Sequence, residues 1–406
     1  MPLTLRMSDI STQLIHHAYQ PPAGFKAVNP AVQKTSTVIF PNVAALRNRD
    51  WKHKTGYTYG LHGTPTTFTL EERIATLEGG QFCTLVPSGL AAVALVGMAF
   101  LKAGDEVLIP DNAYGPNKTF AQHELAGWGI TFRCYDAMAP GDLAGKLSSK
   151  TRLVWLEAPG SVTLEFPDLP GLVAVVKAHG QRHPEGIVTA LDNTWGAGIA
   201  FNAFALGADI SVQALTKYPS GGADVLMGSV VTRDAALHHA VHFCHMRVGY
   251  GIAGNDAELV LRSLGSMALR YAAQDSATRT LAVWLQQQVQ IEAVLHPALP
   301  GSPGHSVWLR DCVAAACLMS IVFKPAYPQA AVDLFCDSLR LFRLGYSWAG
   351  PMSLCVPYDI PAIRTSPWPY KGGLVRFSVG LEAVTDLQAD LAQALASMQY
   401  SQPIHS

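Results

Sequence analysis

The 406-residue sequence has no excess of either charge and no long apolar run. Its 29 Lys and Arg residues nearly balance 30 Asp and Glu residues, which leaves a formal net charge of -1. The strong basic field that holds nucleic acid is therefore missing. The longest apolar run is Leu90–Leu101, which is too short for the ~20 residues of a membrane-spanning helix. We expect a buried helix there, and neither nucleic acid nor a membrane as a partner.

The sequence also lacks a CxxC pair and shows no apolar signal-peptide core near its start. Seven cysteines are scattered along the chain, without a CxxC pair, which is typical of reduced thiols rather than of a disulfide framework. Residues 1–20 carry no apolar signal-peptide core. Apolar residues make up 49% of the chain and charged residues 15%, a composition that excludes disorder as the main state. We expect a cytoplasmic α/β protein.

Three zones can be distinguished along the chain. Residues 1–62 are rich in Pro, Asn and Thr and predict an arm. Residues 63–262 alternate helix-like and strand-like pieces, and residues 263–406 predict a smaller α/β domain with strands over Ala315–Phe323 and Leu374–Val379. The strands expected in the middle zone are Phe82–Val86, Glu106–Ile109, Ile130–Tyr135, Arg152–Leu156, Ile187–Leu191, Ile210–Ala214 and Asp224–Val231. Short apolar strands between helices predict a mostly parallel sheet covered on both faces.

One helix start can be proposed from local pattern alone. Thr69 and Glu72 have the spacing of a capping box, and Leu70, Ile74 and Leu77 share a helical face that ends before two glycines. A helix beginning near Thr69 is therefore expected.

Unusual polar residues follow the predicted strands, where open α/β sheets bind ligands. They are Asp192, Lys217 with Thr216, Gly89 and Tyr114. Taken singly, each has an ordinary structural explanation, as a cap, a surface lysine, a turn or a packed ring. Taken together they suit pyridoxal phosphate, which needs a lysine amine, an acid beside its ring nitrogen, and a helix N-terminus for its phosphate.

The sequence resembles the Cys/Met-metabolism family of pyridoxal-phosphate enzymes over about Tyr57–Leu381. This family contains cystathionine β-lyase, cystathionine γ-lyase, cystathionine γ-synthase and methionine γ-lyase. The motifs that carry the resemblance are Tyr59–Thr66, Pro87–Ala92, Leu191–Trp195, Thr216–Tyr218 and Val375–Gly380. It implies the aspartate-aminotransferase-like fold (fold type I), with a large, mostly parallel seven-stranded sheet domain and a smaller C-terminal α/β domain.

The resemblance also implies roles for residues around the cofactor ring and the substrate. Lys217 would form the covalent link to the cofactor and act in catalysis. Asp192 would pair with the ring nitrogen, and Tyr114 would stack on the ring and take part in catalysis. Arg376 would bind the substrate α-carboxylate, a task suited to its planar, bidentate guanidinium.

The phosphate would be held by a second group of residues. The resemblance implies the backbone N–H groups of Gly89 and Leu90 together with the Thr216 hydroxyl. Tyr59 would reach the phosphate of a neighbouring subunit, so the arm at 1–62 would contribute to that subunit. A homo-oligomer follows, in this family usually a tetramer built as a dimer of dimers.

The segment Tyr346-Ser347-Trp348, expected to bind substrate, resembles the corresponding segment of cystathionine β-lyases, where γ-acting members usually have Glu-Ser-Leu. Asn112–Pro116 and Ala158–Ser161 also favour the β-lyases. We therefore expect a carbon–sulfur β-lyase of methionine biosynthesis, which cleaves cystathionine or a related β-thio amino acid to pyruvate, ammonia and a thiol such as homocysteine. A γ-acting relative is the alternative.

Two residues depart from the β-lyase pattern. Leu61 stands where these enzymes usually have an arginine for the neighbouring subunit's phosphate, and His62 stands where a second arginine often lies near the distal end of the substrate. Simpler substrates such as cystine or S-alkylcysteines therefore remain open.

Two other classes of protein were considered. A metal protein would use the run of His238, His239, His242, Cys244 and His245, but the preferred interpretation is a row of partly exposed helix histidines, and no metal is expected. A non-catalytic scaffold would not need both Lys217 and Arg376.

Overall fold

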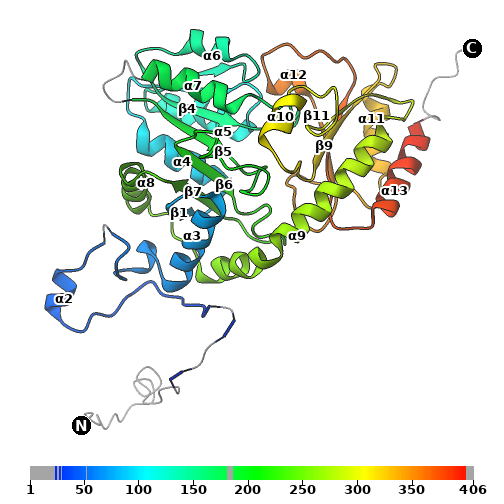
Figure 1. Ribbon diagram of the computed structural model, residues 1–406. Coiled ribbons are helices and arrows are strands. Elements are labelled where there is room, and N and C mark those ends of the chain that lie inside the picture. Colours follow the sequence, from blue (N-terminus) through cyan, green and yellow to red (C-terminus); the bar gives the residue numbers. More distant parts are fainter. Residues whose placement is uncertain (1–22, 25–26, 29, 52, 181–185, 399–406) are drawn as a thin grey trace, which may run out of the picture. The chain divides into compact units, whose positions relative to one another are not determined.

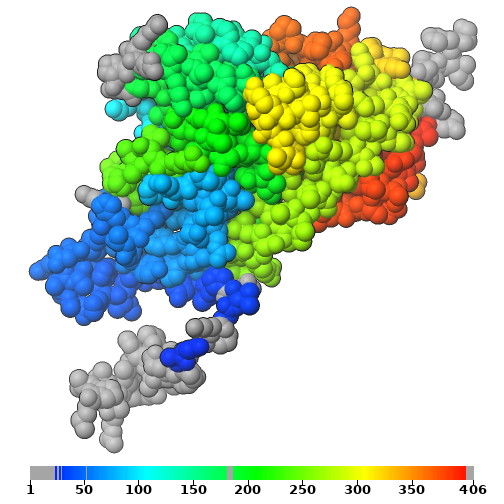
Figure 2. Space-filling view, viewed as in Figure 1, coloured from blue at the N-terminus to red at the C-terminus, as the bar shows by residue number. Residues whose placement is uncertain are grey.

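The computed structural model describes residues 23–24, 27–28, 30–51, 53–180 and 186–398. The chain divides into two compact units, residues 1–31 and 32–406, and all elements below belong to the second. Of the predicted arm, residues 1–22 lie outside the described part. Most side chains between residues 32 and 62 are exposed, and this stretch (dark blue) lies on the outside of the second unit in Figure 2.

The larger sheet has seven strands in the order β1-β7-β6-β5-β4-β2-β3. They are β1 Phe82–Val86, β2 Glu106–Pro110, β3 Thr131–Tyr135, β4 Thr151–Glu157, β5 Val188–Asp192, β6 Ile210–Ala214 and β7 Gly228–Thr232. Strand β7 runs antiparallel to both of its neighbours, and the pairs from β6 across to β3 are parallel. The predicted mostly parallel, seven-stranded sheet is confirmed.

Helices cover both faces of this sheet (Figure 1). The helical elements up to the end of this region are α2 Val43–Arg47, η1 Gly60–His62, α3 Pro65–Glu78, α4 Gly89–Phe100, α5 Gly115–Phe120, η2 Ala121–Leu125, α6 Pro140–Lys146, α7 Leu169–Gly180, α8 Ala235–Val248 and α9 Gly254–Leu285. None of the helices in the described ranges is long and apolar enough to cross a membrane. The apolar run at 90–101 covers all of α4 except its first residue, Gly89. The last residue of the run, Leu101, is the C-cap of this helix.

A second sheet has five strands in the order β10-β11-β12-β9-β8. Its strands are β8 Ile291–Leu295, β9 Leu318–Phe323, β10 Arg343–Leu344, β11 Leu354–Tyr358 and β12 Leu374–Ser378, and its helices are α10 His305–Asp311, α11 Gln329–Ser338, α12 Ile360–Ile363 and α13 Val384–Ser397. Helix α9 runs without a break through residue 262 (Figure 1). The domain boundary at that residue stays a prediction.

The expected start of the first long helix is wrong by one turn. Helix α3 begins at Pro65, and the capping box is formed by Thr64 and Thr67. Proline is favoured at the first helical position because its fixed φ suits the helix and its missing N–H has no partner to lose. The Thr69 hydroxyl instead donates to the Pro65 carbonyl inside the first turn, at 2.7 Å. The strand predicted from Asp224 also begins later, at Gly228.

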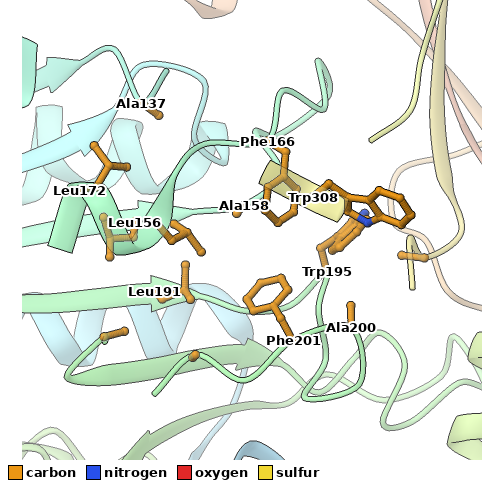
Figure 3. Close-up of a cluster of buried hydrophobic side chains, with 14 of the residues drawn as sticks. Ala137, Leu156, Ala158, Phe166, Leu172, Leu191, Trp195, Ala200, Phe201 and Trp308 are labelled. Carbon is orange, nitrogen blue, oxygen red and sulfur yellow. The ribbon is translucent and has the colours of Figure 1, made fainter. Parts of the chain in front are cut away.

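The largest core joins the sheet to the elements that follow it. Leu156 on β4 and Leu191 on β5 are buried with Phe166 and Trp195 from the loops after these strands, and Trp308 of α10 belongs to the same cluster (Figure 3). Because both strands end at this cluster, its packing fixes where their last residues lie.

Truncating the centre of this core should destabilise the protein. Leu156 is 1% exposed, and Leu156→Ala should lower the free energy of unfolding by about 2–5 kcal/mol, through lost burial and a residual cavity. Val289→Ala, at a side chain that is 68% exposed, should change it by less than about 0.5 kcal/mol. Urea unfolding of both variants measures the difference, and equal effects would contradict this packing.

Candidate active site

A single cavity of about 610 Å³ gathers nearly all of the predicted site residues. It is lined by the carboxyl ends of β4, β5 and β6, by the N-terminus of α4 and by segments of the second sheet region. The predicted residues in its wall are Gly89, Leu90, Tyr114, Asp192, Thr216, Lys217, Tyr346, Ser347, Trp348 and Arg376. Tyr59 does not line it. Its side chain is half exposed and its ring packs against His62.

Lys217 lies just after β6, in a turn closed by its own N–H bonding to the Ala214 carbonyl at 3.0 Å. Its Nζ donates to Ser347 Oγ at 2.6 Å and lies 5.4 Å from the centre of the Trp348 ring. Burial, together with the positive charge of Arg376, lowers the pKa of this amine to about 8. An amine with such a pKa is neutral and nucleophilic in a substantial fraction of molecules near neutral pH.

Asp192 ends β5 beside this lysine. Its Oδ1 accepts hydrogen bonds from the Thr194 backbone N at 3.0 Å and the Thr194 hydroxyl at 2.5 Å. Burial raises the pKa of Asp192 above its usual value, and the Thr194 hydrogen bonds and the Lys217 charge oppose that rise. The carboxylate is thus held in place with no ion-pair partner within 4 Å in the described part of the chain. Such a group can receive a cationic N–H from a ligand.

The N-terminus of α4 faces the same cavity. Ser88 caps the 12-residue helix by accepting the Ala91 N–H at 3.0 Å, and the first amides of a helix have no intrahelical partner. A Cβ at Gly89 would lie 2.6 Å from the Ala214 Cβ, so only glycine lets the helix approach β6 this closely. The free amides at this helix N-terminus are suited to bind an anion. The Thr216 hydroxyl itself is bonded to the backbone of Met227.

Arg376 is a buried cation on β12. Its guanidinium lies 5.2 Å from the centre of the Tyr358 ring, and its Nε has no partner among the described residues. Burial lowers the pKa of Arg376 from its usual value. A buried charge without a counter-ion is costly, so this side chain is suited to bind a carboxylate that enters the pocket.

The segment Tyr346-Ser347-Trp348 forms the wall opposite Lys217. Ser347 has a φ of 101° and Ala349 a φ of 64°, conformations that are costly for residues with a side chain and are found at functional sites. This backbone directs the Ser347 hydroxyl to the lysine amine. Trp348 packs edge-on against Tyr218, whereas Tyr346 is largely exposed.

Comparison with known proteins identifies the family of this chain. The chain matches the Cys/Met metabolism PLP-dependent enzyme family over residues 11–396. It is 37% identical to a cystathionine beta-lyase of Bordetella avium, over 96% of this chain and 99% of that protein. It is 35% identical to the cystathionine beta-lyase MetC of Escherichia coli, over 95% and 98%. The crystal structure of a cystathionine gamma synthase from Xanthomonas oryzae pv. oryzae, in complex with aminoacrylate and cysteine, is similar with a TM-score of 0.83 and 28% identity, over 94% and 96% of the two chains.

The chain belongs to the Cys/Met-metabolism family of PLP-dependent enzymes. It is therefore an enzyme that uses pyridoxal 5'-phosphate in lyase chemistry on sulfur amino acids, on the fold expected from the sequence. The residues present fit the cofactor. An amine with a lowered pKa, a half-buried carboxylate and a glycine-opened helix N-terminus meet in one cavity. The buried Arg376, which has no counter-ion among the described residues, is suited to bind a carboxylate there.

The pKa of Lys217 can be tested in the cofactor-free protein. Below pH 8 the Lys217 amine is protonated, and above it the amine is neutral, so competitive acetylation followed by peptide mass spectrometry should show labelling of Lys217 with a midpoint near pH 8. Arg376→Gln removes a nearby positive charge and should move the midpoint to higher pH. An unmoved midpoint would contradict this electrostatic coupling.

Tyr114 is positioned by a residue that the sequence analysis missed. Tyr114 precedes α5, and its backbone N–H donates to Glu157 Oε2 at 2.8 Å. Glu157 ends β4 and lines the cavity. The rule that placed Asp192 at a strand end could have found it, because β4 lies next to β5.

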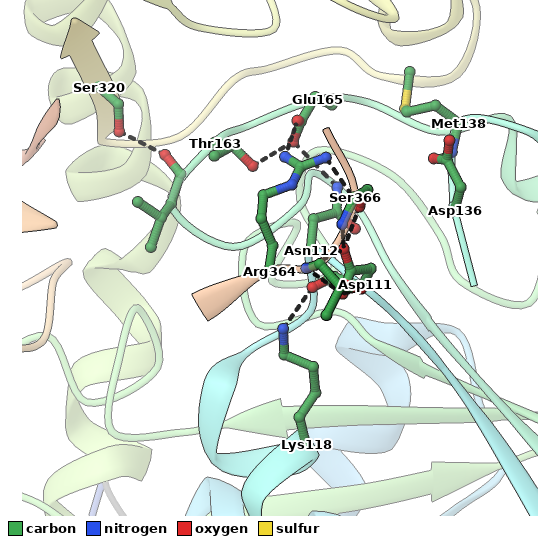
Figure 4. Close-up of polar contacts among 12 residues, drawn as sticks. Asp111, Asn112, Lys118, Asp136, Met138, Thr163, Glu165, Ser320, Arg364 and Ser366 are labelled. Atoms are coloured by element: carbon green, nitrogen blue, oxygen red, sulfur yellow. Dashed lines mark hydrogen bonds and ion pairs between the residues drawn. The ribbon is translucent and has the colours of Figure 1, made fainter. Parts of the chain in front are cut away.

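A polar cluster that was also missed ties this loop to the second sheet region (Figure 4). Asp111 accepts hydrogen bonds from the backbone N and the hydroxyl of both Thr365 and Ser366. Arg364 forms an ion pair of 2.7 Å with Glu165, and both side chains are 11% exposed. Partners 199 to 255 residues apart in sequence give no local signal, so the sequence alone could not pair them.

Three of the four histidines of α8 are buried, so the expectation of partial exposure is wrong for them, whereas His239 is partly exposed. His238, His242 and His245 are 7%, 3% and 7% exposed and form a stack of rings that begins on Phe82. Burial lowers the pKa of His238 and His242 to about 3 and of His245 to about 4. Parallel stacked rings do not converge on a point, and within the described residues no group suited to hold a metal is found.

Proposed function

We propose that this enzyme is a carbon–sulfur β-lyase that cleaves cystathionine or a related β-thio amino acid to pyruvate, ammonia and a thiol. The observation that carries the proposal is the Tyr346-Ser347-Trp348 segment, whose strained Ser347 contacts the Lys217 amine at 2.6 Å. The same three residues resemble the β-lyase sequence, and curated relatives similar to this chain are named cystathionine beta-lyases.

The cofactor would be held by the residues already described. Lys217 would bind its aldehyde carbon, Asp192 its ring nitrogen, and Tyr114 would lie against its ring. The phosphate would be bound by Gly89, Leu90 and Thr216, for which the Thr216 hydroxyl must exchange its bond to Met227. When bound, pyridoxal phosphate supplies an electron sink for the negative charge that develops at the substrate Cα.

The substrate is oriented by its carboxylate. Arg376 binds the α-carboxylate with two parallel hydrogen bonds, and this compensates the buried positive charge. Fixing the carboxylate fixes the direction of the Cα–H bond, which must face the amine of Lys217 for proton removal.

The proton is moved by one group. Once the amino group of the substrate has taken its place on the cofactor, the freed Nζ of Lys217 would remove the proton from Cα as a general base, and it would return that proton to the sulfur as the bond to Cβ breaks. The Ser347 hydroxyl keeps this nitrogen in reach of both positions, and the Trp348 ring beside it excludes water.

The subunit arrangement belongs to the same proposal. Tyr59 lies outside the cavity of its own subunit and is half exposed, so it would complete the phosphate site of a neighbouring subunit in a homo-oligomer. Leu61 can supply no charge there. His62 is bonded to the Thr58 hydroxyl at 2.7 Å, and burial lowers its pKa. A neutral His62 leaves the distal end of the substrate without that cation and favours cystine or S-alkylcysteines among the β-thio substrates.

The products distinguish β- from γ-chemistry. Holoenzyme incubated with cystathionine should release pyruvate and homocysteine, identified by mass spectrometry. 2-Oxobutyrate and cysteine would overturn the proposal in favour of a γ-acting enzyme, the alternative that the similar cystathionine gamma synthase structure supports. Release of pyruvate from cystine or S-methylcysteine, but not from cystathionine, would keep the β-lyase and show the preference for simpler β-thio substrates that a neutral His62 predicts.

A further inference from the structure

Two carboxyl groups lie next to one another at the edge of the sheet that forms the pocket. Glu157 at the end of β4 is directly in register with Asp192 at the end of β5, and the strands are parallel. Residues in register on neighbouring strands project to the same face, and both side chains line the cavity. Both residues are half-buried, and two ionised carboxylates this close in a pocket partly shielded from water repel each other.

Hydrogen bonds support the two carboxyl groups unequally. Asp192 receives two hydrogen bonds from Thr194, one of them from a hydroxyl at 2.5 Å. Glu157 receives one hydrogen bond, from the Tyr114 N–H at 2.8 Å. The carboxylate with more donors is the better place for a negative charge.

The charged groups around Glu157 do not compensate a negative charge on its carboxyl group. Asp192 on β5 is negative, and the phenols of Tyr114 and of Tyr135 on β3 are neutral. Lys118 on α5 is the cation that faces it, but its Nζ is bound to the carbonyls of Asp111 and Ile363. In the described ranges no cation lies within ion-pair distance of Glu157. Burial, and next the charge of Asp192, raise the pKa of Glu157 well above its usual value.

We propose that Glu157 is a neutral carboxylic acid at neutral pH, and that the Glu157–Asp192 pair carries one negative charge, held on Asp192. Glu157 is then a positioning residue with two effects. Its carbonyl-type oxygen holds the backbone of Tyr114. Its proton keeps a second negative charge out of a pocket whose Arg376 must receive a carboxylate. This inference does not depend on which carbon–sulfur bond is cleaved.

Infrared spectroscopy tests the protonation state directly. The wild-type holoenzyme at neutral pH should show the carbonyl stretch of a protonated carboxylic acid, and Glu157→Gln should remove this band. Burial also raises the pKa of another acid, Glu78, to about 7. The Glu78→Gln variant therefore identifies the part of the infrared band that comes from Glu78. A spectrum that is the same in wild type and Glu157→Gln would overturn the proposal.

Stability measured against pH gives an independent readout. The folded state of the wild type keeps a proton on Glu157 that the unfolded chain releases above a pKa of about 4.3. Stability is therefore lost as pH rises from there toward the folded-state value. Glu157→Gln has no such proton, so its Tm relative to wild type should rise steadily between about pH 4 and pH 8. A Tm difference that does not change with pH would indicate packing alone and would contradict the proposal.

If the Glu157→Gln variant does not fold, infrared spectra of the Asp192→Asn variant provide the test. Removing the neighbouring charge should lower the pKa of Glu157, so its infrared band should disappear at lower pH than in the wild type. A band that titrates at the same pH in both proteins would show that the two carboxyl groups are not coupled, and would overturn the inference.

Discussion

Lys217→Ala should reduce formation of keto acid from cystathionine by at least about 1000-fold, since a positioned general base alone contributes about 10²–10⁴-fold. The substitution removes the amine that lies 2.6 Å from Ser347 Oγ. Burial lowers the pKa of this amine to about 8. Among the described residues, Lys217 is the one lysine that lines the cavity. Keto acid formation and the visible absorbance of the bound cofactor, measured on the same sample, check this prediction.

Lys217→Arg is the matched control, because it keeps a positive charge and a hydrogen-bond donor near Ser347. A guanidinium has too high a pKa to act as a base at neutral pH, so this variant should be as inactive as the alanine variant. Substantial turnover by either variant would remove Lys217 from the mechanism.

Arg376→Gln should lower kcat/KM by about 30-fold to several thousand-fold. Removing one partner of a buried, hydrogen-bonded charge pair costs about 2–5 kcal/mol, and each 1.4 kcal/mol corresponds to tenfold. In the free enzyme the buried guanidinium has no counter-ion among the described residues, so the variant should fold at least as stably as the wild type. Steady-state kinetics and thermal unfolding, measured together, separate these two effects.

Arg310→Lys provides the comparison. Arg310 is bound to Asp168 and Asp311 on the surface and does not line the cavity, so kcat/KM should stay within about twofold because surface substitutions have small effects. If Arg376→Gln behaved like this variant, another group would have to bind the substrate carboxylate.

The sequence predicted the large sheet well because its strands are short apolar runs that stop at polar residues. Asp192 and Lys217 could be found because Asp192 ends β5 and Lys217 follows β6, at the sheet edge where ligands bind. Helix starts were less accurate. The pattern of Thr69 and Glu72 looked like a capping box, but α3 begins at Pro65, and the structure shows that Thr64 and Thr67 cap its first amides.

Contacts between distant residues could not be predicted in the same way. The partners Asp111 and Thr365, or Glu165 and Arg364, lie on different sheet regions, and their pairing depends on how the two regions pack. The histidine stack on α8 was misjudged for a related reason. Polar side chains usually predict exposure, and here the helix face that carries them packs against β1, where Phe82 stacks on His238.

The central claim is that pyridoxal phosphate binds in the pocket around Lys217, and borohydride reduction of the holoenzyme tests it most directly. Reduction fixes the cofactor to the lysine that holds it, and peptide mass spectrometry locates the added mass. We predict that the modified peptide contains Lys217. Modification of another lysine, such as Lys118 beside the same pocket or Lys54 outside it, would contradict the assignment of the site.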